Sequence, residues 1–162
     1  MAALERKLGE VWADIDVLER QDFVAAIDAV TEELAADDPL RLFERGAARD
    51  STGYPDLAVP LYQAALEHGL SGERRRRAVI QMASSIRNLG QPEKAVELLT
   101  EELKNPHDHL EGAVKTFLAL ALADLGRERE GLSVAIEALS GYLPRYNRST
   151  ERYAQALLEE SE

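Results

Sequence analysis

The sequence predicts an all-α fold, a solenoid of helix pairs, and three observations carry this prediction. Ala, Leu, Glu and Arg dominate the composition while Ile, Val and Thr are sparse, so strong helix formers prevail. No stretch of four or more residues alternates convincingly between apolar and polar, so we expect no strand. Gly53, Gly90 and Gly126 stand 37 and 36 residues apart, and a period of this length with two helices is typical of a helical solenoid.

The chain is expected to begin with a degenerate helix pair over residues 4–36. The first helix, about residues 3–18, places apolar residues on one side: Leu4, Leu8, Val11, Trp12, Ile15 and Leu18. Trp12 is interpreted as a core anchor of this pair, with a binding role as the alternative. The second helix buries Phe23, Ile27, Val30 and Leu34.

Asp38 followed by Pro39 predicts the next helix start, because aspartate is a good N-cap and proline lacks an N–H that the first helical position does not need. Glycines, Asn105-Pro106 and Pro144 separate the helices that follow. They are expected near residues 39–51, 55–68, 73–89, 92–104, 108–125, 128–141 and 148–160. We expect one domain, residues 1–162, with repeats at about 39–70, 73–106 and 108–143 and a capping helix at about 148–160.

Small residues recur where the two helices of each repeat would cross. The first helices carry Gly46, Ala83 and Ala119, and each glycine of the period is followed five residues later by Ala58, Ala95 or Gly131. Closely crossing helices leave no room for a branched side chain. In these features the sequence resembles the tetratricopeptide repeat family, although the family's early tryptophan and its tyrosine are absent. The bulky position of the second helix is Tyr62 or Leu99 but Ala135 in the third repeat.

The resemblance implies a right-handed α-α superhelix in which the first helices of the repeats line a concave groove that binds a peptide or protein segment. Carried over to this chain, it names ten groove residues: Phe43, Asp50, Gln81, Ser84, Arg87, Asn88, Thr116, Phe117, Leu120 and Asp124. The polar residues around Arg87 share a helix with an apolar face, and packing does not need them.

Arg87 has two interpretations. Asp50 and Asp124 occupy matching or adjacent places in the neighbouring repeats, so the arginine could form an ion pair that joins repeats. Alternatively, its fixed fork of donors grips a carboxylate or carbonyl of the partner. The arginine run of residues 73–77 is expected to meet acidic neighbours or water, with a docking patch for an acidic partner as the alternative.

The charge and the motifs exclude several functions. A formal net charge of −11 argues against nucleic acid or an anionic membrane as a partner. The apolar run of residues 117–123 is too short to span a membrane, and the start is too charged for a signal peptide. His107-Asp108-His109 lacks a third ligand, no catalytic motif occurs, and there is no cysteine. We therefore expect that the protein is not an enzyme and that it binds neither a metal nor a cofactor. We expect a cytoplasmic location.

The expected function is therefore a non-catalytic protein–protein interaction module or adaptor. Two alternatives stay open at this point. One is a homo-oligomeric structural protein, for example a homodimer formed through Tyr153, Ala156 and Leu157 of the final helix. The other is a regulatory domain that senses a small molecule.

Overall fold

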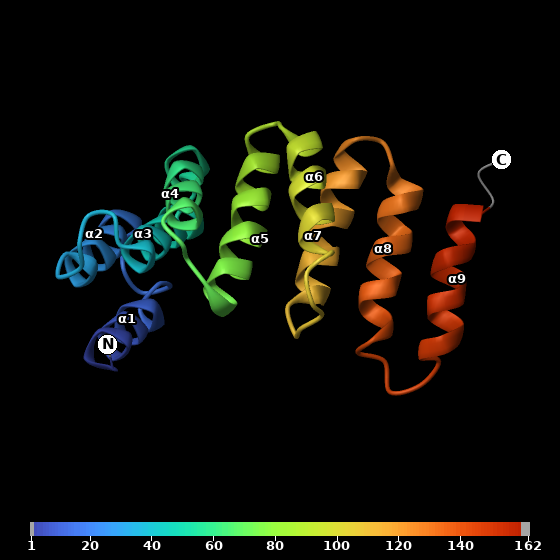
Figure 1. Ribbon diagram of the computed structural model, residues 1–162, viewed down its shortest axis with the longest axis horizontal. Helices are drawn as coiled ribbons and strands as arrows, with labels where there is room; N and C mark the ends of the chain where they lie inside the picture. Colours follow the sequence, from blue (N-terminus) through green and yellow to red (C-terminus); the bar gives the residue numbers. More distant parts are fainter. Residues whose placement is uncertain (1, 160–162) are drawn as a thin grey trace. The chain divides into compact units, whose positions relative to one another are not determined.

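The structure, a computed structural model, describes residues 2–159, and these form nine α-helices without a strand (Figure 1). The predicted all-α class is confirmed. The helices are α1 (Ala2–Ala13), α2 (Arg20–Thr31), α3 (Pro39–Ser51), α4 (Pro55–Glu67), α5 (Gly72–Asn88), α6 (Pro92–Glu102), α7 (Glu111–Asp124), α8 (Glu128–Ser140) and α9 (Asn147–Glu159).

Local signals set most of the helix ends. The side chain of Asp38 accepts hydrogen bonds from the backbone N–H groups of Leu40 (2.8 Å) and Arg41 (3.4 Å), which confirms it as the N-cap of α3. The first helix is shorter than expected and ends at Ala13, because the chain changes there to tighter turns through Asp14, a poor helix former. Residue 160, the expected end of the last helix, lies outside the described residues.

The helices divide into two compact units, Met1–Ser85 and Ile86–Glu162, with the boundary inside α5. In the first unit α1 packs on α2, α2 on α3, and α3 on α4. In the second unit α6 packs on α7, α7 on α8, and α8 on α9, and Figure 1 shows α7, α8 and α9 with alternating directions. The expected single domain stays a prediction.

The buried carboxylate of Glu44 on α3 bonds side chains of α1 and α5 in the first unit. Glu44 is 4% exposed and accepts hydrogen bonds from Trp12 Nε1 (2.9 Å) and Arg74 Nε (3.1 Å). The Trp12 ring also packs edge-on against Phe23, with centroids 5.1 Å apart, so its core interpretation is confirmed. Arg74 forms a second ion pair with Glu5 at 2.7 Å, as expected of an arginine in the basic run. Such paired charges avoid the penalty of a lone buried carboxylate.

Aromatic rings fill the space between α3 and α4. The helices approach closely at Gly46, where an added Cβ would lie 3.1 Å from the ring of Tyr62. The rings of Phe43 and Tyr62 are both 0% exposed and their centroids are 6.1 Å apart. Arg77 covers Phe43 with its guanidinium carbon 5.4 Å from the ring centroid, a cation–π contact.

Asp50 is held beside these rings. Its carboxylate accepts hydrogen bonds from Ser85 Oγ (2.7 Å) and from the Tyr62 hydroxyl (3.3 Å). Burial raises the pKa of Asp50, and the two hydrogen bonds only partly offset this effect. Burial, together with the nearby carboxylate, also raises the pKa of Tyr62, so the tyrosine stays a hydrogen-bond donor.

In the second unit, α7 and α8 meet at backbone distance. A Cβ added to Gly131 would lie 2.8 Å from the carbonyl oxygen of Ala119, which is closer than packed carbon and oxygen atoms approach. The small residue is therefore required by the position of the neighbouring backbone and not by its own conformation.

The crossing at Gly131 can be tested with one substitution at two places. Gly131→Ala is expected to lower the free energy of unfolding by about 1–3 kcal/mol, because the two backbones must move apart. Gly9→Ala is the matched control: its Cβ would meet nothing within 4 Å on α1, so it should stabilise by about 0.5–1 kcal/mol. Urea denaturation followed by circular dichroism measures both values. Equal signs would contradict the close crossing.

Asp50→Asn tests the buried carboxylate through pH. Because the folded protein raises the pKa of Asp50, it binds the proton more tightly than the unfolded chain does. Ionisation of Asp50 therefore lowers stability as the pH rises from the unfolded pKa, about 3.9, through the raised folded pKa. The melting temperature of the variant minus that of the wild type should grow over this interval and then level off. A difference that shrinks with rising pH would contradict the raised pKa.

Candidate functional site

Four of the ten predicted groove residues lie in the first unit. Phe43 contributes packing and no surface that a partner could touch, because Tyr62 and Arg77 enclose its ring. Asp50 is half-buried, and its carboxylate is bonded to Ser85 and Tyr62. The remaining two, Gln81 and Ser84, are half-buried polar residues of α5.

The other six lie in the second unit, where the structure brings two of them together. Arg87 Nε lies 2.6 Å from Asp124 Oδ2 in an ion pair. The hydrogen bond of this pair is donated by Arg87 Nη2 to Asp124 Oδ1 at 3.3 Å. The two side chains are 24% and 40% exposed. This pair joins the end of α5 to the end of α7 and still faces solvent, so its geometry is compatible with both interpretations of Arg87.

The remaining four residues differ in exposure. Leu120 is 42% exposed on α7, while Phe117 is half-buried. Asn88 and Thr116 are exposed, and the Thr116 hydroxyl donates to the carbonyl of Gly112 at 2.7 Å within the same helix. The solvent-facing side of α7 therefore combines the apolar Leu120 with the small polar Thr116.

An apolar depression of about 480 Å³ lies between α7 and α8. Its lining comes equally from α7 (Thr116, Ala119, Leu120, Ala123) and from α8 (Glu128, Gly131, Leu132, Ala135). Leu132 is 51% exposed at its edge. The sequence prediction named only the α7 side, because the resemblance assigns binding to first helices. The signal for the α8 side was Ala135, which is small where the other repeats are bulky.

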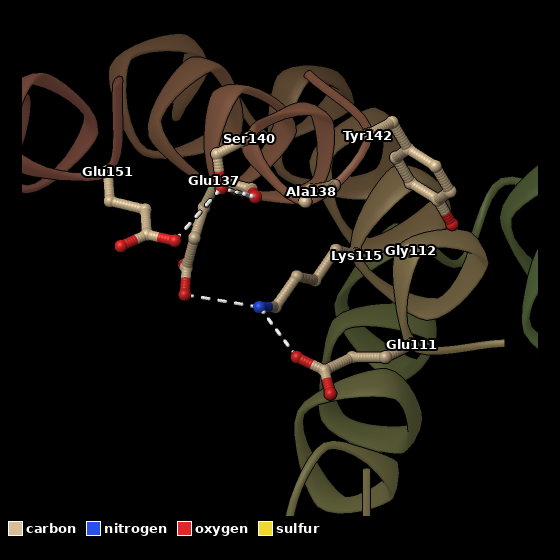
Figure 2. A pocket seen from close by; sticks show the side chains of 9 residues that line it. Glu111, Gly112, Lys115, Glu137, Ala138, Ser140, Tyr142 and Glu151 are labelled. Atoms are coloured by element: carbon tan, nitrogen blue, oxygen red, sulfur yellow. Dashed lines mark hydrogen bonds and ion pairs between the residues drawn. The ribbon is translucent and has the colours of Figure 1, made fainter. Parts of the chain in front are cut away.

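A second, polar pocket of about 270 Å³ lies near the other end of the same helix pair. Figure 2 shows the ammonium group of Lys115 between the carboxylates of Glu111 and Glu137, at 2.7 and 3.1 Å. The Ser140 hydroxyl donates a hydrogen bond to Glu151 Oε1 at 3.4 Å across the pocket, and the Tyr142 side chain lies over Gly112.

Ion pairing fixes the charges in this polar pocket. The hydrogen bond with Lys115 lowers the pKa of Glu111. Burial by itself lowers the pKa of Lys115, but the hydrogen bonds with Glu111 and Glu137 outweigh burial and raise it. Glu111 and Lys115 therefore stay charged near neutral pH, which does not suit a general acid or base, and the contact between Lys115 and Glu137 ties α7 to α8.

The capping helix α9 closes the second unit. Ser133 Oγ donates to the carbonyl of Ala154 at 2.6 Å, and Asn147 Nδ2 donates to the carbonyl of Ser140 at 2.7 Å. Ala154 faces α8 and is buried, whereas Tyr153 is exposed on α9. Ala156 and Leu157 are half-buried.

Within residues 2–159, no group of three or more His, Cys, Asp or Glu side chains is placed to hold a metal ion. His107 contacts Glu111 instead. None of the described helices is both long and apolar enough to cross a membrane.

The comparisons with known proteins agree with this architecture. A family model described as Tetratrico peptide repeat matches residues 39–157, which take in all three expected repeats and most of the capping helix. No curated protein and no solved structure gives a significant match. Since the match covers most of a chain whose helix pairs α3–α4 and α7–α8 approach closely at small residues, the chain belongs to the tetratricopeptide repeat family.

Proposed function

We propose that this protein is a non-catalytic interaction module that binds a peptide or protein segment along the solvent-facing side of α7. Repeats of this family generally mediate protein–protein interaction. One observation carries the more specific proposal: exposed Leu120 and Thr116 lie on the same helix as Asp124, which pairs with Arg87. Peptide sites combine apolar area with a few oriented polar groups in this way.

Arg87 and Asn88 supply donors for the bound segment. Asp124 restrains the guanidinium of Arg87, so little side-chain freedom would be lost on binding. Asn88, the next residue, is exposed and has an amide that can both donate and accept. Together they suit the backbone carbonyls of an extended segment. In the first unit, Gln81 and Ser84 of α5 are half-buried and stay candidate polar contacts.

The double variant Arg87→Ala/Asn88→Ala is expected to lose partner binding and to keep its helicity and melting temperature nearly unchanged. A partly exposed ion pair contributes only about 0–1 kcal/mol to stability, so its removal should hardly affect folding. Affinity capture from cells of the native host, followed by mass spectrometry, compares the proteins retained by the variant and by the wild type. Circular dichroism gives the melting temperature.

Arg127→Ala is the matched control, because Arg127 also pairs with a carboxylate, Glu130, at 2.6 Å. It should retain the same proteins as the wild type. A large drop in melting temperature for the Arg87/Asn88 variant would instead assign Arg87 to a structural ion pair. Equal capture by all three proteins would refute the proposed surface.

A further inference from the structure

We infer that the depression between α7 and α8 accepts an aromatic side chain from a partner segment that carries a lysine or arginine beside it. This inference rests on the proposed function and names the chemistry of its partner. It follows from a comparison of the first and third repeats, each taken within its own unit.

The two repeats are in register at a separation of 73 residues, the distance from Gly53 to Gly126. At this separation Gly46 of α3 corresponds to Ala119 of α7, and Ala58 of α4 corresponds to Gly131 of α8. These are the small residues at the helix crossings. The space that flanks the crossing can therefore be compared residue by residue.

In the first repeat, two aromatic rings fill that space. Phe43 and Tyr62 are both 0% exposed there. Their counterparts in the third repeat are Thr116 and Ala135, and both line the depression of about 480 Å³. In the second repeat the counterpart of Tyr62 is Leu99, which is also fully buried. Only the third repeat has small residues at both positions.

The helices of the third repeat do not move together to fill the space that two aromatic rings occupy in the first repeat. Its two helices already cross as closely as they can at Gly131, because a Cβ added there would lie only 2.8 Å from the carbonyl oxygen of Ala119. The space left by the rings stays open to solvent between Leu120 and Leu132. An aromatic side chain from outside would restore the packing of the first repeat and bury on the order of 150–250 Å² of its own surface.

Charge indicates what flanks this aromatic residue. Glu128 is the one charged residue among those that line the depression, and it forms no hydrogen bond or ion pair with any described residue. In the first repeat a cation, Arg77, lies over the buried ring of Phe43. A lysine or arginine next to the incoming ring would meet Glu128, and this exposed pair would select the partner more than strengthen binding.

The test fills the depression with the two aromatic side chains of the first repeat, in a double variant that we call the plug. Thr116→Phe/Ala135→Tyr should fold, because it rebuilds a pair that the same chain already packs. Thr100→Phe/Ala25→Tyr makes the same two changes at exposed positions outside the depression and is the matched control. Leu132→Glu, at an exposed position on the edge of the depression, gives an independent variant that does not depend on repacking.

Random peptides displayed on phage are selected on the immobilised wild-type protein, and enriched sequences are synthesised and titrated calorimetrically. We expect an aromatic residue adjacent to lysine or arginine in the enriched peptides. The plug and Leu132→Glu should each weaken binding at least about tenfold, the loss expected when an aromatic anchor cannot be buried. The control should bind like the wild type, and Glu128→Gln should weaken binding by about two- to fivefold.

Four results would overturn the inference, and they are distinguishable. Enriched peptides that lack an aromatic residue, or that bind the plug unchanged but not the Arg87/Asn88 variant, would refute it while leaving the proposed function intact. No enriched peptide at all would contradict both. Concentration-dependent dimerisation that the plug abolishes would assign the depression to exposed Tyr142 or Tyr146 of a second copy.

Discussion

The structure depends on how closely the two helices of a repeat cross. At Gly131 the backbone of α7 leaves no room for a Cβ, and at Gly46 the ring of Tyr62 is nearly as close. A crossing held at such short range sets the width of the space on either side of it. Side chains from both helices must then fill that space, and their size decides whether the repeat is closed, as in α3–α4, or open, as in α7–α8.

The bonded carboxylates of Glu44 and Asp50 in the first unit are less exposed than the carboxylate of Asp124, which pairs with Arg87 in the second unit. In the first unit, the buried carboxylate of Glu44 and the half-buried one of Asp50 each accept two side-chain hydrogen bonds, which satisfies groups that would otherwise be costly to bury. In the second unit the side chains of Arg87 and Asp124 are 24% and 40% exposed, whereas those of Lys115 and Glu111 are 15% and 19% exposed. The exposed apolar side chains of Leu120 and Leu132 in the second unit remain accessible to a partner.

Local features were predictable from the sequence, and so was the Arg87–Asp124 pair, which the repeat period brings into register. Other features that join distant residues were not. The Asp38-Pro39 start and the small residue at Gly131 depend on neighbours in sequence or on the repeat period, and the structure has both. The burial of Phe43 depends on Arg77, which comes from another helix. Likewise, no sequence pattern indicates the ion pair between Lys115 and Glu137, which are 22 residues apart. The α8 wall of the depression was not predicted, because the resemblance assigns binding to the first helices.

The departure of the third repeat from the pattern is more informative than its agreement. Large-to-small changes in a packed interior cost about 2–5 kcal/mol, and less at a site open to solvent. The first repeat proves that this chain can fill the equivalent space with two rings, so the fold itself does not require Thr116 and Ala135. Small residues there give up packing that stability alone would favour. The binding surface that we propose would account for that loss, because side chains of a partner could replace the contacts that the third repeat lacks.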